Sequence, residues 1–189
     1  MGEKHKRLAD YARVAVRLER ETGAPAAFLV AQWAIESAWG ERQSGDFNFW
    51  GIIYNPNLHK AFKWCPTREV LTQRQIDALD PEEKREMRVT SVLPSGKSEV
   101  QLRRRFASFA TESEARASYV RLIQGKTRYG KAIAEYTRQP EKNTAALAAF
   151  IDAIAASGYA TDPGYAKLLK AVATQPDVTL ALAQACAEC

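Results

Sequence analysis

The sequence has few of the residues that commonly hold metals or form disulfide frameworks. Its 189 residues include 3 cysteines and 2 histidines. Cys186 and Cys189 lie three residues apart near the C-terminal end, and Cys65 stands alone, with no histidine at ligand spacing. This pattern argues against a zinc site, and no phosphate-binding glycine loop is present. We therefore predict no metal and no cofactor.

Long apolar runs are also missing. No stretch of about 20 apolar residues is present, so the sequence predicts no transmembrane helix and no stable membrane association. The N-terminal segment 1–20 is charged and amphipathic and lacks the apolar core of a secretory signal peptide. No repeat, low-complexity tract or flexible linker interrupts the chain, which predicts a single domain over residues 1–189 and a monomer.

The charge is moderately basic. The net charge of +5 favours an anionic partner: nucleic acid, an acidic membrane face or an acidic wall polymer. No recognisable nucleic-acid-binding motif is present, and the aromatic residues cluster near an acid rather than among lysines and arginines. We therefore predict no nucleic-acid partner.

The segment from Phe28 to Ile53 organises the rest of the chain. Pro25 suits a first helical position, and residues 26–39 are apolar on nearly all sides, which predicts a buried helix closed by Gly40. Glu36 lies near the end of that helix and shares one face with Gln32. Burial and the helix C-terminus would both raise the pKa of Glu36, as a general acid requires. The alternative is an exposed Glu36, or one paired with an arginine.

These residues resemble a known family. AQWAIESAWGER at 31–42, followed by NFWGI at 48–52, is similar to the catalytic helix and loop of glycoside hydrolase family 73, the flagellar-rod-hydrolase and autolysin type of glucosaminidase. Residues 157–169, SGYATDPGYAKLL, resemble a second family motif, and residues 106–129 follow the family's middle helix. Together the three matches span about residues 20–172.

The resemblance implies an α+β, mostly α fold. We expect a lysozyme-like helical domain, with a small β-hairpin lobe at about residues 60–109 flanking the active-site groove. A hairpin is predicted from Val89–Leu93, a turn at Pro94–Lys97 and Glu99–Phe106. Two short helices should precede it, one capped by Thr72 and one beginning at Asp80-Pro81. The helical segment 73–88 is longer than the usual hairpin of the family.

The resemblance also implies a second acid in this lobe. Glu69, in the context Thr-Arg-Glu-Val, is similar to the family's T-x-E, and Glu99 is the alternative. The remaining helices are expected at residues 111–125 and 131–138 and after Asn143, Asp162 and Pro176.

Other site residues are expected around these acids. The family counterpart of Tyr159 lines the active site, so Tyr159 is predicted to contact the substrate or order a water. Aromatic rings suit the apolar faces of sugars, and for Trp33 and Phe49 a core position is the simpler interpretation. His59 is interpreted as a surface residue. The predicted substrate-binding residues are Gln32, Trp39, Asn48, Trp50, Tyr54 and Trp64.

The implied activity is hydrolysis of the β-1,4 bond between N-acetylglucosamine and N-acetylmuramic acid in peptidoglycan glycan strands. Glu36 would protonate the leaving oxygen. Glu69 would activate water, act directly as a nucleophile, or support attack by the sugar's own acetamido group. Lytic transglycosylase, muramidase and non-catalytic wall-binding module are the alternatives. Action on the bacterial wall without a visible signal peptide favours a phage endolysin or export by another route.

Overall fold

The computed structural model describes residues 2–125, 127–156 and 164–188. The chain divides into two compact units. The helical unit comprises Met1–Gln43 and Glu112–Cys189, and the sheet unit comprises Ser44–Thr111. The sheet unit includes the lobe predicted at about 60–109 and begins earlier in the chain.

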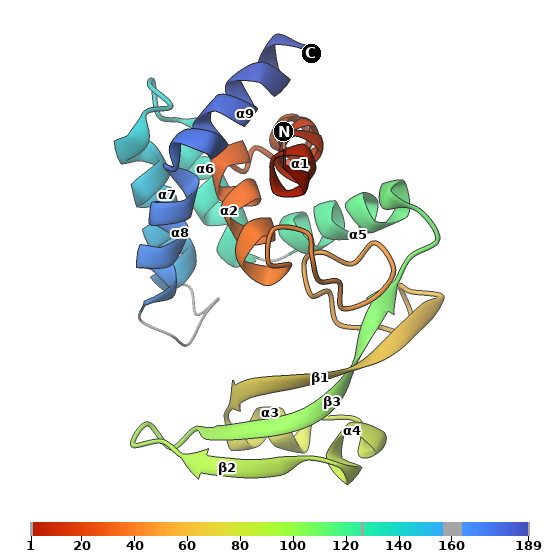
Figure 1. Cartoon of the computed structure of the whole chain (residues 1–189). Helices are drawn as coiled ribbons and strands as arrows, with labels where there is room; N and C mark the ends of the chain where they lie inside the picture. The colour runs from red at the N-terminus through yellow and green to blue at the C-terminus, as the bar shows by residue number, and fades with distance from the viewer. Residues whose placement is uncertain (1, 126, 157–163, 189) are drawn as a thin grey trace. The chain divides into compact units, whose positions relative to one another are not determined.

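The helical unit contains the helices that the sequence predicts (Figure 1), although the helix expected at 131–138 already begins at Thr127. The helix start expected at Asp162 lies outside the described residues. They are α1 (Glu3–Thr22), α2 (Ala26–Glu36), α5 (Glu112–Gly125), α6 (Thr127–Thr137), α7 (Thr144–Ala156), α8 (Tyr165–Ala173) and α9 (Pro176–Ala187). Asn143 caps α7, with its Oδ1 accepting from the Ala146 N–H at 3.0 Å. Pro176 begins α9, as the sequence predicts.

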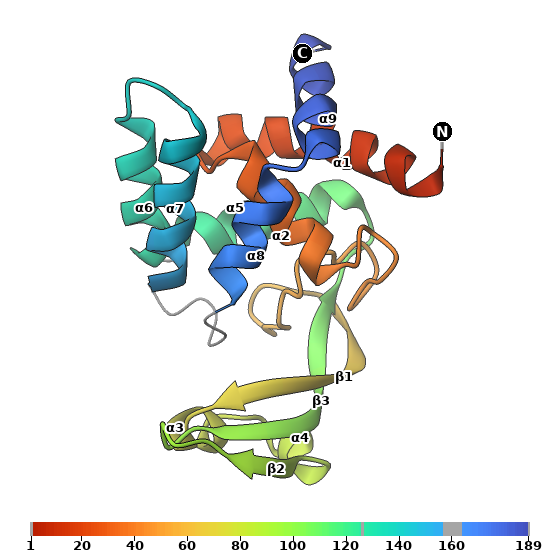
Figure 2. The same cartoon turned by 60° about the vertical axis from the view of Figure 1, so that its left-hand side comes forward.

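Helix α2 is the buried element of this unit. It packs against α1, α8 and α9 (Figure 2), and every residue from Ala26 to Ala34 except Ala27 is buried. Gly23 ends α1 in the left-handed conformation, with φ of 76°. The chain then turns back, so that Tyr11 of α1 stacks on Trp33 of α2 with ring centroids 4.4 Å apart. Helices α1 and α2 therefore pack side by side.

The sheet unit is built on three antiparallel strands in the order β1-β3-β2. They are β1 (Ala61–Leu71), β2 (Arg88–Val92) and β3 (Ser98–Ser108). The predicted hairpin is confirmed as β2 and β3. Two short helices, α3 (Gln73–Asp77) and α4 (Pro81–Arg85), lie between β1 and β2. A capping box of Thr72 and Gln75 begins α3, and the Asp80 carboxylate accepts from the Glu82 N–H at the start of α4.

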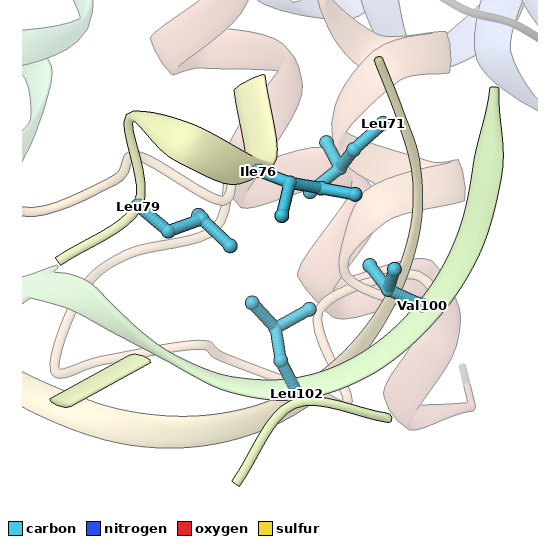
Figure 3. Close-up of a cluster of buried hydrophobic side chains, with 5 residues drawn as sticks. All are labelled: Leu71, Ile76, Leu79, Val100 and Leu102. Atoms are coloured by element: carbon cyan, nitrogen blue, oxygen red, sulfur yellow. The ribbon is translucent and has the colours of Figure 1, made fainter. Parts of the chain in front are cut away.

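A small hydrophobic cluster holds α3 to one face of the sheet (Figure 3). The cross-strand pairs Glu69–Val100 and Thr67–Leu102 put Val100 and Leu102 on the same face as Glu69. That face is covered, because the buried cluster comprises Leu71, Ile76, Leu79, Val100 and Leu102. The opposite face carries the alternate residues of each strand.

The mostly helical α+β fold is confirmed, and three local expectations are wrong. Helix α2 ends at Glu36 rather than Trp39, and α4 ends at Arg85 because Arg88 already pairs within the sheet. His59 is buried: its Nδ1 accepts from the Asn55 N–H, and its ring packs against Phe109. Among the described residues, no helix is long and apolar enough to cross a membrane.

Candidate active site

Glu36 is the last residue of α2, and an unusual turn follows it. Ala38, Trp39 and Gly40 all have positive φ, at 50°, 60° and 79°. Non-glycine residues seldom adopt this conformation, and where they do the surrounding structure usually enforces it. The helix therefore stops abruptly, and the side chain of Glu36 emerges at its end.

Four hydrogen bonds hold this turn. The Ser37 hydroxyl donates to the Trp33 carbonyl at 2.5 Å and accepts from the Gly40 N–H at 2.8 Å. Arg7 of α1 donates from Nε to the Trp39 carbonyl at 2.9 Å and from Nη2 to Glu41 at 3.0 Å. Because these contacts reach back to α1 and α2, the end of α2 is fixed by the helical unit.

Glu36 is an exposed residue, which is one of the alternatives that the sequence left open beside burial. Desolvation by the surrounding protein nevertheless raises the pKa of Glu36, and a hydrogen bond from Tyr165 acts in the opposite direction. The direction of this shift is the one that a general acid requires, because it extends the protonated form toward neutral pH.

Tyr165 is the partner that the sequence argument did not single out. It begins α8, and its hydroxyl donates to Glu36 Oε1 at 3.1 Å. Its signal was present in the quoted motif, where it is the second tyrosine of GYATDPGYA. Tyr159, the tyrosine chosen from the sequence, lies outside the described residues.

Gln32 and Trp39 occupy different environments in the helical unit. Gln32 is 1% exposed, and its Oε1 accepts a hydrogen bond from the Tyr119 hydroxyl of α5. Trp39 is half-buried, packs edge-on to Trp33 and lies under the Lys4 ammonium, 3.9 Å from its ring centroid. Gln32 thus ties α2 to α5, and Trp39 leaves part of its ring accessible.

In the sheet unit, Asn48 fastens the loop that precedes β1. Its Nδ2 donates to the carbonyls of Ile52 and Ala107 at 2.9 and 2.8 Å, and its Oδ1 accepts from the Ile52 N–H at 2.9 Å. Asn48 is 1% exposed and Trp50 is 5% exposed. Both side chains are therefore part of the interior of this unit.

Tyr54 and Trp64 belong to a partly exposed aromatic group. The Tyr54 and Phe62 rings lie 4.8 Å apart, and Phe62 packs edge-on to Trp64. The Arg105 guanidinium lies 5.5 to 5.7 Å from the centroids of all three rings. Such a surface offers apolar faces and a cationic donor together, which suits a sugar bearing polar or acidic groups.

The two candidates for the second acid differ in their surroundings. Glu69 lies on the helix-covered face and pairs with Arg104, its Oε2 accepting from Nη1 at 2.7 Å, with both side chains about one-fifth exposed at 21% and 19%. Glu99 is exposed and accepts from the Ser91 hydroxyl at 2.6 Å. Glu69 is thus engaged in a structural ion pair, whereas Glu99 is accessible to solvent.

Within the described part of the chain, no group of three or more histidine, cysteine or acidic side chains could hold a metal ion. Cys65 and Cys186 are free thiols, and the Cys65 thiol donates to the Ser44 carbonyl.

The helical unit carries an acid at the end of its buried helix, and the sheet unit is a small antiparallel sheet; such an accessible acid with a raised pKa suits a glycosidase. The family model described as mannosyl-glycoprotein endo-β-N-acetylglucosaminidase matches residues 12–178. The chain belongs to this glucosaminidase family and is a glycoside hydrolase.

Solved structures share the fold. A peptidoglycan hydrolase from Sphingomonas sp. A1 is 24% identical, with 94% of this chain and 97% of that chain covered and a TM-score of 0.59. The glycoside hydrolase domain of FlgJ from Salmonella typhimurium is 21% identical, with 100% and 96% covered and a TM-score of 0.57. The catalytic domain of the autolysin Auto from Listeria monocytogenes is 18% identical, with 96% and 89% covered and a TM-score of 0.56. The search of curated proteins gave no match.

Proposed function

We propose that this glucosaminidase hydrolyses the β-1,4 bond between N-acetylglucosamine and N-acetylmuramic acid in peptidoglycan, with Glu36 as the general acid. The observation that carries the proposal is the position of Glu36 at the end of α2, with a raised pKa and a hydrogen bond from Tyr165. The protonated carboxyl would donate its proton to the leaving glycosidic oxygen.

The choice of bond and polymer has two sources. Membership of the glucosaminidase family supports a bond next to N-acetylglucosamine. The Sphingomonas structures that share the fold are described as peptidoglycan hydrolases, which supports peptidoglycan as the polymer. Hydrolysis of peptidoglycan would place the site of action outside the cytoplasm.

The second carboxylate is proposed to be Glu69 or Glu99. The sequence motif favours Glu69, whereas accessibility favours Glu99, because an acid that activates water or stabilises a cationic sugar must reach it. If Glu99 is the second acid, the ion pair of Glu69 with Arg104 would orient this part of the sheet unit. The activity and stability of Glu69→Gln and Glu99→Gln separate the role of second acid from that of a structural ion pair.

For substrate contacts we propose Trp39, Tyr54 and Trp64, whose rings are partly accessible, and we retain Tyr159 from the sequence motif. Gln32, Asn48 and Trp50 are buried, so their contribution to binding would be indirect, through the position of α2 and of the loop 44–53. A monomer without nucleic-acid or membrane partners stays a prediction.

The test is mass spectrometry of purified peptidoglycan after digestion and borohydride reduction. Reduced N-acetylglucosamine ends would support the proposal. Anhydro-muramic ends would identify a lytic transglycosylase, and reduced N-acetylmuramic ends a muramidase. If wild-type protein binds the wall and releases nothing, the chain is a binding module.

A further inference from the structure

A cavity of about 710 Å³ lies in the sheet unit and is lined by four arginines. Arg68 comes from β1, Arg103 from β3, Arg85 from the end of α4 and Arg88 from the start of β2. Glu86 is the one acid among its lining residues, so the side chains around the cavity carry a net charge of +3 (four arginines less one glutamate).

The strand register explains how these charges gather. Gln101 of β3 is the cross-strand partner of both Arg68 and Arg88. The three strands lie side by side with β3 in the middle (Figure 1). The two arginines are therefore two strand spacings apart, about 10 Å, with a neutral amide between them. Arg103 lies two residues beyond Gln101 and so shares its face.

Among the described residues, most of these guanidinium groups have no anionic partner. Arg103 approaches Glu86 at 3.9 Å, and both side chains are more than half exposed, at 52% and 60%. For Arg68, Arg85 and Arg88, the described part of the chain provides no hydrogen bond or ion pair to the side chain. By contrast, Arg104 and Arg105 are paired with Glu69 and Asp80 at 2.7 and 2.5 Å.

Arg103 of β3 lies diagonally across from both Arg68 of β1 and Arg88 of β2, and like charges this close on one sheet face repel each other. An arrangement that gathers these charges on one face is favourable when an external anion binds. The arginine fork matches carboxylate and phosphate oxygens in bidentate geometry. The cavity has room for more than one such group, which favours a polymer that carries repeated negative charges.

We propose that this cavity is a binding subsite for carboxylate groups on the peptide side chains of peptidoglycan, separate from the acid at Glu36. The inference rests on the proposed function, which supplies the substrate. Two of the arginines, Arg85 at the end of α4 and Arg88 at the start of β2, come from the connection between β1 and β3. The subsite would let this chain retain acidic wall material while Glu36 acts on the glycan.

The test measures binding and cleavage separately. Co-sedimentation with purified sacculi is measured for the Glu36→Gln protein, which is the parent because it should bind without cleaving. The cavity pair Arg68→Gln/Arg88→Gln and the control pair Arg74→Gln/Arg121→Gln are each added to this parent. The control pair removes the same charge from exposed arginines outside the cavity. We expect the cavity pair to bind about tenfold more weakly and the control pair to bind within about twofold of the parent.

Two further arms identify the ligand. The parent should bind sacculi whose carboxyl groups have been converted to amides more weakly than it binds intact sacculi. Its affinity should fall to that of the cavity variant for intact sacculi. Equal losses in both variant pairs, or unchanged binding to amidated sacculi, would overturn the proposal. Displacement by polyphosphate without any effect of amidation would assign the cavity to phosphate and overturn the carboxylate assignment.

The two proposals fail in different ways. The wild-type protein, in which Glu36 is intact, is tested for glycan release. If it releases no glycan and the Arg68→Gln/Arg88→Gln variant still binds sacculi more weakly, the hydrolase assignment fails and the subsite stands. Folding is checked by thermal melting. Because removal of Arg68 and Arg88 relieves repulsion, the melting temperature of the cavity variant should equal or exceed that of the parent.

Discussion

The Tyr165 hydroxyl donates a hydrogen bond to Glu36 Oε1 at 3.1 Å, joining the start of α8 to the end of α2. This bond favours the charged carboxylate and so opposes the desolvation that raises the pKa of Glu36. Tyr165→Phe should therefore raise that pKa further and shift the alkaline limb of the pH profile of kcat/KM upward. An unchanged profile in a folded variant would show that the bond does not form in the active enzyme.

Glu36→Gln should reduce turnover at least about 100-fold, because the amide cannot supply the proton. Release of soluble fragments from purified peptidoglycan measures the loss, with circular dichroism to confirm the fold. If Glu36→Gln clears cell walls at a rate near that of the wild type, the assignment of Glu36 as the general acid is wrong.

The same substitution should change stability in a pH-dependent manner. The pKa of Glu36 is raised in the folded state, so its contribution to stability is fully present below the unfolded value of 4.5 and is lost as pH rises through the folded pKa. At pH 7, above the unfolded value of 4.5, the raised pKa means that Glu36 destabilises the fold, and Glu36→Gln should melt at a higher temperature than wild type. The difference should shrink as pH falls toward 4.5. A variant that is less stable at pH 7 would contradict this sign.

Glu69→Gln and Glu99→Gln should separate the two candidates for the second acid. Glu69→Gln removes the charge opposite Arg104 and should cost more than about 1 kcal/mol of unfolding free energy, whereas Glu99 is exposed and its substitution should be nearly neutral. Loss of kcat/KM by at least about tenfold identifies the second acid. If Glu99→Gln loses kcat/KM and Glu69→Gln retains it, the motif-based choice of Glu69 is wrong.

Gly40→Ala should destabilise the turn that follows α2. The residue has φ of 79°, and an added Cβ would lie 2.8 Å from Trp33 Cζ2. Gly96→Ala is the matched control, because its φ is 74° but no atom lies within 4 Å of the added Cβ. We expect a loss of about 1 kcal/mol at Gly96 and roughly 3 kcal/mol at Gly40 by urea denaturation. Equal losses would show that the Trp33 ring moves aside without cost.

Asn48→Ala should lower stability rather than act mainly on substrate affinity. The substitution removes the hydrogen bonds of Asn48 to the Ile52 N–H and the Ala107 carbonyl, whereas the Ile52 carbonyl keeps its bond from the Ala107 N–H, at a cost of roughly 2 kcal/mol or more. Asn57→Ala, at an exposed position of the same loop region, should stay within about 0.5 kcal/mol of wild type. A raised KM with an unchanged melting temperature would instead support direct substrate contact by Asn48.

The sequence by itself determined most of the helices, the hairpin and the general acid candidate. The apolar run 26–34 fixed α2 as a buried helix, because few polar residues interrupt it. The signals at Thr72, Asp80, Asn143 and Pro176 fixed the starts of four helices, because capping depends on residues within one turn of each other. The hairpin of β2 and β3 followed from a turn sequence between two alternating strands.

Tertiary structure decided what depends on contacts between distant residues. Helix α2 stops at Glu36 because Arg7, 32 residues from Trp39 in sequence, holds the Trp39 carbonyl. Glu69 acquires its ion pair from Arg104, and His59 is buried against Phe109. Tyr165 reaches Glu36 across 129 residues of chain. Local periodicity carries no information about such partners, because packing between separate helices and strands selects them.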